Sequence, residues 1–226
     1  IVTDDQAALL AYEADSFDFT RAANSAAKQL KANPPKGAKI IEAQSTRYVW
    51  LTINMNAEPL KDPRVRQAIQ YAYDGDAVVQ GAYDGLVSRA AGVVQPGTKF
   101  AREKNIIATR DVEKAKALLA EAGVSDLSLK LYCQTDSTQQ AIAQIIQASL
   151  GEAGITVEIQ PTEDAAYWAL GDKTQGDGYK SIELVLMNFA GGIDPTENLV
   201  WFRPDQIGVY NWSFFDSKEF EDLYQK

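Results

Sequence analysis

Apolar residues along this chain follow two different periods, and segments of the two kinds alternate. Short runs rich in apolar residues are typical of strands, whereas apolar residues three and four positions apart are typical of helices that face a core. The strand-type runs cover residues 48–54, 127–133, 155–160 and 183–188, and the helix-type runs cover 63–74, 76–83, 112–121, 137–150 and 163–170. This alternation predicts a layered α/β domain.

Residues 59–85 predict two consecutive helices. Asp62 can accept hydrogen bonds from the open N–H groups of a first turn, and Pro63 has its φ angle preset for a first helical position. Gly75 is expected to end this helix and Asp76 to cap the next. The first helix has an apolar stripe at Val65, Ala68, Ile69, Ala72 and Tyr73. Taken alone, this pattern indicates an ordinary helical hairpin.

Other helix ends follow the same chemistry. Asp136 or Ser137 is expected to cap the helix over 137–150, with Gly151 or Gly154 ending it, and Gly123 to end the preceding helix. The last ten residues, SKEFEDLYQK, predict a capped amphipathic helix. No Pro-rich linker, low-complexity tract or internal repeat divides the chain, so we expect one compact unit.

Composition excludes several partners. The 226 residues are 46% apolar and 23% charged, which suits an ordinary globular core. The net charge of −9, without a dense Lys/Arg patch, argues against nucleic acid or an anionic membrane surface as the main partner. No apolar run approaches the roughly 20 residues that span a bilayer, and residues 1–30 lack the basic start and apolar region of a signal peptide.

Enzyme chemistry is difficult to build from these residues. The chain contains no His, which excludes Ser-His and Cys-His nucleophile pairs and His-ligated zinc. Cys133 is the single Cys, lies at the end of a strand-type run, and is expected to be a buried, inert thiol. We therefore expect no catalytic residue, no metal ligand and no cofactor.

Carboxylates gather in three places, namely Asp4 and Asp5, Glu163 and Asp164, and Glu219, Glu221 and Asp222. All three lie at expected helix starts or on exposed faces, where capping and the helix dipole account for acidic residues. No spacing marks the converging acid pair of a glycosidase. The Gly- and Asp-rich segment 171–178 is expected to be a surface turn.

Two loops after strands are candidates for binding, because α/β domains open their clefts at the carboxyl ends of strands. The first covers residues 133–138, with Thr135 and Asp136 before a helix start whose free N–H groups favour an acceptor or anion. The second covers residues 188–198. There Asn188 offers a donor and an acceptor and Phe189 a flat apolar face, although core packing of Phe189 is equally open.

The Gly pair in the second loop could let backbone approach a solute closely, or permit a positive-φ turn that aims Phe189 at it. Asp194 is expected to cap a helix beginning at Pro195. Trp201, Tyr210, Asn211 and Trp212 could line the same mouth, while a core or interface role for both Trp residues stays open. The candidate ligand-binding residues are Asn188, Phe189, Ala190, Gly191, Gly192, Thr135, Asp136, Asn211 and Trp212.

Four segments, in order, resemble the family 5 extracellular solute-binding proteins, which are peptide, nickel and oligosaccharide receptors of ABC importers. They are PLKDPRVRQAIQYAYDGDAVVQGAYDG, TRDVEKAKALLAEAGV, AQIIQASLGEAGITVEI and FAGGIDPTENL. The Arg that commonly follows the Asp of the first segment is Gly75 here. The resemblance implies a periplasmic-binding-protein-like lobe of the class II type, with a mixed sheet flanked by helices.

The resemblance also implies a function. We expect residues 1–226 to form a single α/β lobe of a longer two-lobe protein, truncated at both ends. Such a protein would capture a solute between its lobes as a non-enzymatic monomer, in the periplasm or as a cell-surface lipoprotein, and deliver it to ABC permease subunits. The alternatives are a descendant of the fold that binds a protein partner in a regulatory or chaperone-like role, or a cleft hydrolase.

Family knowledge narrows the solute. Dipeptide receptors of this family carry an Arg at about the place of Cys133 for the peptide carboxylate, and an Asp near Gly191 for the amino terminus. Neither is present here. A charged terminus without a partner in a closed cleft would cost several kcal/mol, so we expect no dipeptide recognition of the usual kind. Longer peptides, oligosaccharides and other neutral or weakly charged compounds stay open, with nickel chelates less favoured.

Overall fold

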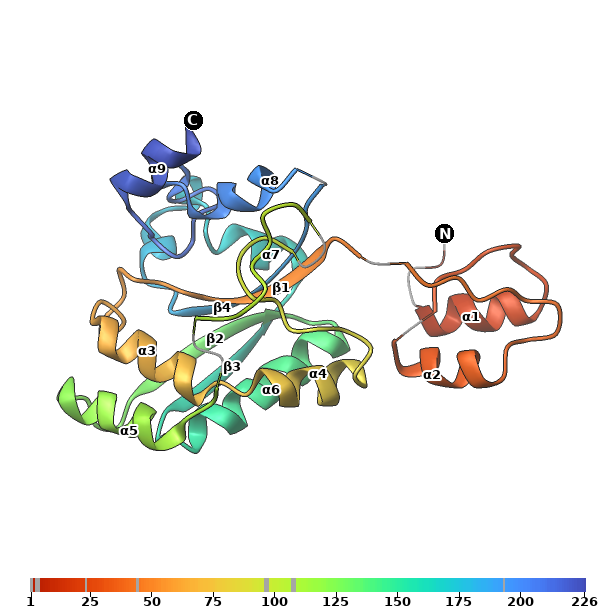
Figure 1. Cartoon of the computed structure of the whole chain (residues 1–226), viewed down its shortest axis with the longest axis horizontal. Coiled ribbons are helices and arrows are strands. Elements are labelled where there is room, and N and C mark those ends of the chain that lie inside the picture. Colours follow the sequence, from red (N-terminus) through yellow and green to blue (C-terminus); the bar gives the residue numbers. More distant parts are fainter. Residues whose placement is uncertain are drawn as a thin grey trace.

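A computed structural model describes residues 2, 5–22, 24–43, 45–95, 98–106, 109–192 and 194–226. Its centre is a four-stranded sheet in the order β1-β4-β2-β3 (Figure 1). The strands are β1 (Arg47–Ile53), β2 (Ser128–Gln134), β3 (Thr156–Thr162) and β4 (Leu184–Ala190). β2 runs parallel to both β3 and β4, whereas β1 is antiparallel to β4. The predicted mixed α/β sheet is confirmed.

Helices cover both faces of this sheet. On one face lie α3 (Pro63–Ala72), α4 (Gly75–Tyr83), α5 (Val112–Glu121) and α6 (Ser137–Gly151) (Figure 1). On the other lie α7 (Asp164–Ala169), α8 (Thr196–Leu199) and α9 (Lys218–Tyr224). Short 3₁₀ helices cover Lys173–Gln175, Asp177–Lys180, Val200–Phe202 and Pro204–Gln206. The segment 171–178 is not a simple turn, because it contains the first of these short helices and the start of the second.

Strand β4 divides the interior into two cores because alternate residues of a strand point to opposite faces. Leu184 and Leu186 belong to a core shared with α3 to α6. Val185 and Met187 belong to a second, aromatic core on the α7 side. Its buried members are Tyr167, Ile182, Val185, Met187, Trp201 and Trp212, and we call this group the aromatic core. The candidate binding residues after β4 lie beside it.

The helix pair over residues 59–85 forms with one shift. Asp62 caps α3 as predicted, accepting a hydrogen bond from the Arg64 N–H at 2.8 Å. The expectation that Asp76 caps α4 is wrong, because Asp74 accepts from the Ala77 N–H at 2.8 Å and the helix begins at Gly75. Gly75 therefore begins α4 rather than ending α3, and a Cβ on it would lie 2.7 Å from Nε of Arg89, whose side chain would have to move.

Helices α1 (Asp5–Glu13) and α2 (Asn24–Ala32) stand apart from the sheet in Figure 1. Lys28 of this pair forms an ion pair with Asp84, at 3.4 Å, at the end of α4. Phe19, between the two helices, and Ile41, after α2, are 76% and 69% exposed. Asp4, expected at a helix start, lies outside the described residues. Within the described chain, no helix has the length and apolar character required to cross a membrane.

Candidate functional site

A hollow of about 400 Å³ opens at one edge of the sheet, where β2 and β4 end and β1 begins. Arg47 at the start of β1 lies opposite Ala190 at the end of β4, which brings three strands and their loops together. The residues that line this first hollow are Arg47, Gln134, Asp164, Trp168, Asn188, Phe189, Ala190, Trp201 and Tyr210. Its volume lies within the range of small-molecule sites, about 300 to 1,000 Å³.

Aromatic rings form most of its wall. The Trp201 ring lies 5.2 Å from the Phe189 ring, 5.3 Å from Tyr210 and 6.3 Å from Trp168, measured between centroids. Trp201 is only 5% exposed, whereas Trp168 and Tyr210 are 38% and 47% exposed. The buried Trp201 ring therefore anchors the wall to the aromatic core, and the exposed rings of Trp168 and Tyr210 present apolar faces to a solute.

The position of Phe189 is compatible with either of the roles left open by the sequence. Its ring packs against the aromatic core and also lines the hollow. Asn188 lines the hollow beside it and accepts a hydrogen bond from the guanidinium of Arg47. Ala190 completes the contribution of β4. These three predicted binding residues are therefore brought together.

The glycines that follow serve the loop itself. A side chain on Gly191 would clash with Asn198, and a Cβ on Gly192 would lie 2.5 Å from a carboxylate oxygen of Glu197. The Gly192 N–H donates to Glu197 at 2.6 Å, and neither glycine has a positive φ. Of the two alternatives, the positive-φ turn is therefore not formed, whereas close approach to a solute stays a prediction. In this structure the two glycines allow close packing on residues 197 and 198.

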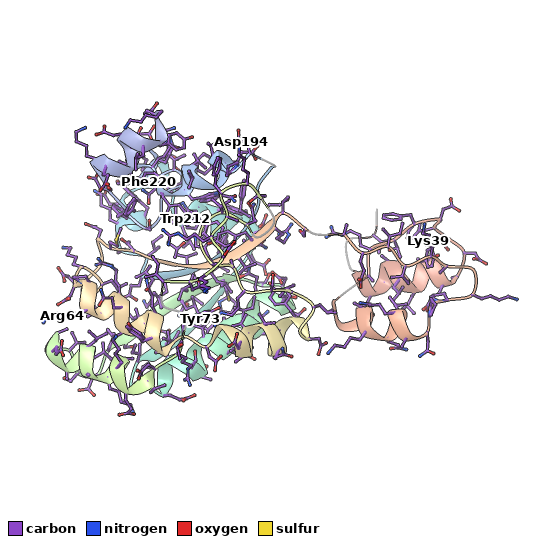
Figure 2. The ribbon with its side chains drawn as sticks, viewed as in Figure 1. Lys39, Arg64, Tyr73, Asp194, Trp212 and Phe220 are labelled. Carbon is purple, nitrogen blue, oxygen red and sulfur yellow. The ribbon has the colours of Figure 1, made fainter. Side chains whose placement is uncertain are left out.

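The cap expected of Asp194 does not form, because Pro195 occupies the N-cap position of α8 without a side-chain hydrogen bond. The Asp194 carboxylate instead accepts from the N–H of Thr196 at 2.9 Å and from its hydroxyl at 2.8 Å, in a turn just before α8 (Figure 2). These hydrogen bonds lower the pKa of Asp194. The helix begins at Thr196, one residue later than predicted. Ile193, also within this loop, lies outside the described residues.

Asn211 does not reach the hollow. Its side chain has 0% exposure and donates to the carbonyls of Arg203 and Phe215 at 2.9 and 2.8 Å. The side-chain oxygen of Asn211, Oδ1, accepts from the Ser213 hydroxyl at 2.8 Å. This amide holds the turns of the 203–215 segment together, so the expectation that it contacts a solute does not fit this conformation.

Trp212, labelled in Figure 2, belongs to the aromatic core. Its exposed fraction is 3%. Its indole N–H donates to the Val209 carbonyl at 2.9 Å. It nevertheless lines a second hollow of about 340 Å³, together with Asp172, Lys173, Thr174, Gly208 and Val209 and with three residues of the first hollow, Trp168, Trp201 and Tyr210. The two hollows are therefore neighbours along one aromatic wall.

Thr135 and Asp136 are exposed but lie outside the lining of both hollows. The Asp136 carboxylate caps α6 by accepting from the Gln139 N–H at 3.0 Å, as predicted for one of two possible caps. The Thr135 carbonyl accepts from the Gln140 side chain at 2.6 Å. Their neighbour Gln134 is the residue of this loop that lines the hollow.

Asp164 lies at the start of α7, as predicted, but its carboxylate faces the hollow. Its Oδ1 accepts from the Gln134 amide at 2.6 Å and from the Trp168 indole at 3.0 Å. Gln134 lies within the first candidate loop, whereas Arg47, Asp164 and Trp168 were not predicted as site residues. The Arg47–Ala190 pairing across β1 and β4 brings Arg47 to this edge, and the sequence gives no direct signal for that register.

Cys133 is buried at the end of β2, as predicted. Burial, followed by the nearby Asp136 carboxylate, raises the pKa of the Cys133 thiol to about 11. Such a thiol is mostly protonated at neutral pH and therefore a poor nucleophile. Among the described residues, no group of three or more Cys, Asp and Glu side chains has the arrangement of a metal site.

Comparison with known proteins gives a consistent picture. Residues 1–206 match the model of the bacterial extracellular solute-binding proteins, family 5, middle region. The chain is 28% identical over 197 residues to the glutathione-binding protein GsiB of Escherichia coli K12, covering 83% of this chain and 38% of that protein. The chain is 30% identical over 179 residues to GsiB of Salmonella choleraesuis, and this match covers 78% of this chain and 34% of that protein.

Solved structures of solute-binding proteins share the fold of this chain. The chain superposes on the ABC transporter substrate-binding protein CtaP of Listeria monocytogenes with a TM-score of 0.87 at 26% identity, covering 100% of this chain and 46% of that one. The oligopeptide-binding protein AppA of Bacillus subtilis, in complex with a nonapeptide, shares the fold with a TM-score of 0.82 at 22% identity, covering 100% and 47%. This chain therefore spans less than half of the length of these relatives.

Proposed function

The chain belongs to the family 5 bacterial extracellular solute-binding proteins, and from this premise we propose that it supplies one side of the solute site of an ABC importer receptor. The complete receptor captures a solute between two lobes and delivers it to permease subunits in the membrane. It performs no chemical step. It works outside the cytoplasmic membrane, as a monomer in the periplasm or as a cell-surface lipoprotein, and does not bind nucleic acid.

One observation carries this proposal: the aromatic hollow at the sheet edge, with a few polar side chains among its rings. Apolar walls with a small number of placed polar groups are typical of small-molecule sites. The hollow forms where strands end, as clefts of α/β domains do. Its contributors come from β1, β2, β4, α7 and the segment after α8, so the fold rather than one loop positions them.

The hollow supplies only one wall, which suits a site closed by a second lobe. Trp168 and Tyr210 keep 38% and 47% of their surface exposed, and a hinge closure would bury these rings against the solute. The sheet body over residues 45–226 carries this wall. The expectation that residues 1–226 form one lobe stays a prediction, and we propose that α1 and α2, which stand apart, pack on the remainder of the receptor.

The solute classes that we propose are a peptide-like compound, an oligosaccharide or another small solute, and not a dipeptide bound in the way usual for the family. Glutathione-binding proteins and an oligopeptide-binding protein are among the relatives, which supports the peptide-like class. Aromatic rings also stack on sugars, so the wall alone does not separate these classes.

The proposal is tested by thermal denaturation of the full-length protein with glutathione, trialanine or maltotriose. A solute that binds only the folded state raises the melting temperature by mass action. At a concentration 100 times the dissociation constant, it increases the free energy of unfolding by about 2.7 kcal/mol. We expect at least one probe to do so, with 1:1 stoichiometry in calorimetry. Unchanged melting with all three would contradict binding of these solute classes.

Two alternatives predict different results. A descendant of the fold that binds a protein partner would show no shift with small solutes but would bind a protein through the cleft surface. A cleft hydrolase would convert its solute, which chromatography of the incubated probe detects. The absence of His favours the receptor over the hydrolase, and so does the presence of one acid, Asp164, among the described residues that line the first hollow.

A further inference from the structure

Two buried side-chain amides lie behind the loop that follows β4, and three of their polar atoms have no hydrogen-bond partner among the described residues. Asn198, on α8, and Gln95, in the segment between α4 and α5, are each 3% exposed. The atoms without a partner are Oδ1 and Nδ2 of Asn198 and Oε1 of Gln95. Nearly all buried polar atoms have partners, because leaving one without a hydrogen bond is unfavourable.

Both amides border Gly191. A Cβ on Gly191 would lie 2.9 Å from Nε2 of Gln95 and would clash with Oδ1 of Asn198. The two side chains therefore reach the same place from different elements. Since neither polar atom of Asn198 has a partner, the amides approach each other without forming a hydrogen bond.

Each amide is attached to a different part of the first hollow. Nε2 of Gln95 donates to the carbonyl of Thr46 at 2.9 Å, and Thr46 directly precedes Arg47 of β1. Asn198 lies three residues before Trp201. Arg47 and Trp201 both line the first hollow. A group that joined the two amides would therefore fix the start of β1 relative to the buried part of the aromatic wall.

A water molecule has the chemistry that these atoms require. It can donate to an amide oxygen and accept from an amide N–H at the same time. Buried waters occur about once per 27 residues in globular proteins, and each makes about three hydrogen bonds to polar groups that lack other partners. A buried ion would need a counter-charge, and both of these amides are neutral.

We infer that the amides of Gln95 and Asn198 bind a buried water molecule behind Gly191, and that this water joins the segment between α4 and α5 to α8. The inference goes beyond the proposed function and does not depend on it, because the protein holds this water without a solute. The alternative is direct pairing, in which both amides rotate and each donates to the oxygen of the other. The hydrogen bond from Gln95 to Thr46 restricts that rotation and favours the water.

A high-resolution crystal structure of the full-length protein tests the site directly. We expect a water oxygen about 2.7 to 3.2 Å from a polar atom of Asn198 and equally close to a polar atom of Gln95, which is the ordinary range of hydrogen bonds. Two amides in direct contact, with no water within that range of both, would overturn the inference.

Asn198→Leu in the full-length protein tests the same site in solution, since leucine has nearly the same size without polar atoms. If Asn198 had no partner of any kind, this change would leave the melting temperature unchanged or raise it. Because the variant loses the hydrogen bonds to the water, we expect its melting temperature to fall by about 2 °C or more. Oxygen-17 relaxation dispersion of the solvent, which detects long-lived buried waters, should show about one fewer such water in the variant.

Asn211→Leu is the matched control, because Asn211 is also buried but donates to the carbonyls of Arg203 and Phe215. Its loss should lower the melting temperature and leave the number of long-lived waters unchanged. For Asn198→Leu, lower stability with no loss of water would indicate direct pairing of the amides, and higher stability would indicate amides without partners. Either result would overturn the inference. If Asn198→Leu does not fold, the crystal structure of the wild type decides.

Discussion

Phe189 contributes to two surfaces, the wall of the first hollow and the edge of the aromatic core. The sequence left both roles open, because an aromatic residue after a buried strand suits either. The ring contact with Trp201, at 5.2 Å between centroids, ties them together. A substitution here should therefore change solute binding and stability in the same variant.

Phe189→Ala in the full-length receptor should weaken solute binding by about 1 to 3 kcal/mol and leave the far-UV spectrum intact. Lost packing should also lower stability, by less than the roughly 3 to 5 kcal/mol of a fully buried Phe. Phe215→Ala is the control, since Phe215 makes a similar edge contact with Phe220 at 5.5 Å but lies outside both hollows. Unchanged affinity in Phe189→Ala would assign this ring to packing alone.

Cys133 gives a second prediction at this scale. Burial raises the pKa of its thiol from 9.0 to about 11, so the folded chain should react very slowly with a thiol reagent such as DTNB at pH 8, and rapidly after unfolding in urea. Because the pKa is raised in the folded state, the corresponding stability is complete below pH 9 and is lost as the pH rises toward 11. Rapid labelling of the native chain would show that the thiol is accessible.

At the scale of elements, the start of α4 distinguishes a capping residue from its neighbour. Asp74→Ala should lower the free energy of unfolding by about 0.5 to 2 kcal/mol, because the Ala77 N–H loses its acceptor. Asp74→Asn keeps a good cap and should lower it much less, which separates capping from the ion pair with Arg110 at 3.8 Å.

Asp76→Ala provides the comparison along the same helix. Asp76 forms an exposed ion pair with Arg89 at 3.3 Å and holds no cap, so its loss should cost between about 0 and 1 kcal/mol. Urea denaturation of the three variants measures the differences. A larger loss in Asp76→Ala than in Asp74→Ala would restore the capping residue that the sequence indicated.

The helices and strands were predictable from the periodicity of apolar residues. The strand register that brings distant residues together at the first hollow was not. All four strands and the helices over 63–83, 112–121 and 137–151 follow apolar patterns that the printed chain displays. Arg47, in contrast, reaches the hollow only through its register with Ala190, more than a hundred residues away. Local patterns do not encode such pairing, so the site was predicted from the loops after β2 and β4 and missed its contributions from β1 and α7.

Asp164 shows the same limit in a different way. Two adjacent acids before a helix are usually explained by capping, and Glu163 and Asp164 do precede and begin α7. Their different roles depend on Gln134 and Trp168, which donate to one of the two carboxylates. The sequence around Glu163 and Asp164 does not indicate which of the two carboxylates faces the hollow.

At the scale of the molecule, the chain carries one wall of the proposed site. We expect the isolated 226-residue chain to fold, because both cores are formed within it. It should bind the solute of the full-length receptor at least about tenfold more weakly, since closure by the other lobe supplies much of the buried contact. Parallel calorimetry on the two proteins measures this, and equal affinities would contradict a two-lobe site.

The division of the interior by β4 has an optical consequence. All four tryptophans, Trp50, Trp168, Trp201 and Trp212, lie in or against the aromatic core, and none lies in the core shared with α3 to α6. The ultraviolet-excited emission of this chain therefore originates almost wholly on the side of the sheet that bears the two hollows. Quenching by acrylamide reports how open that side is, while the side covered by α3 to α6, whose core holds no tryptophan, contributes little to the signal.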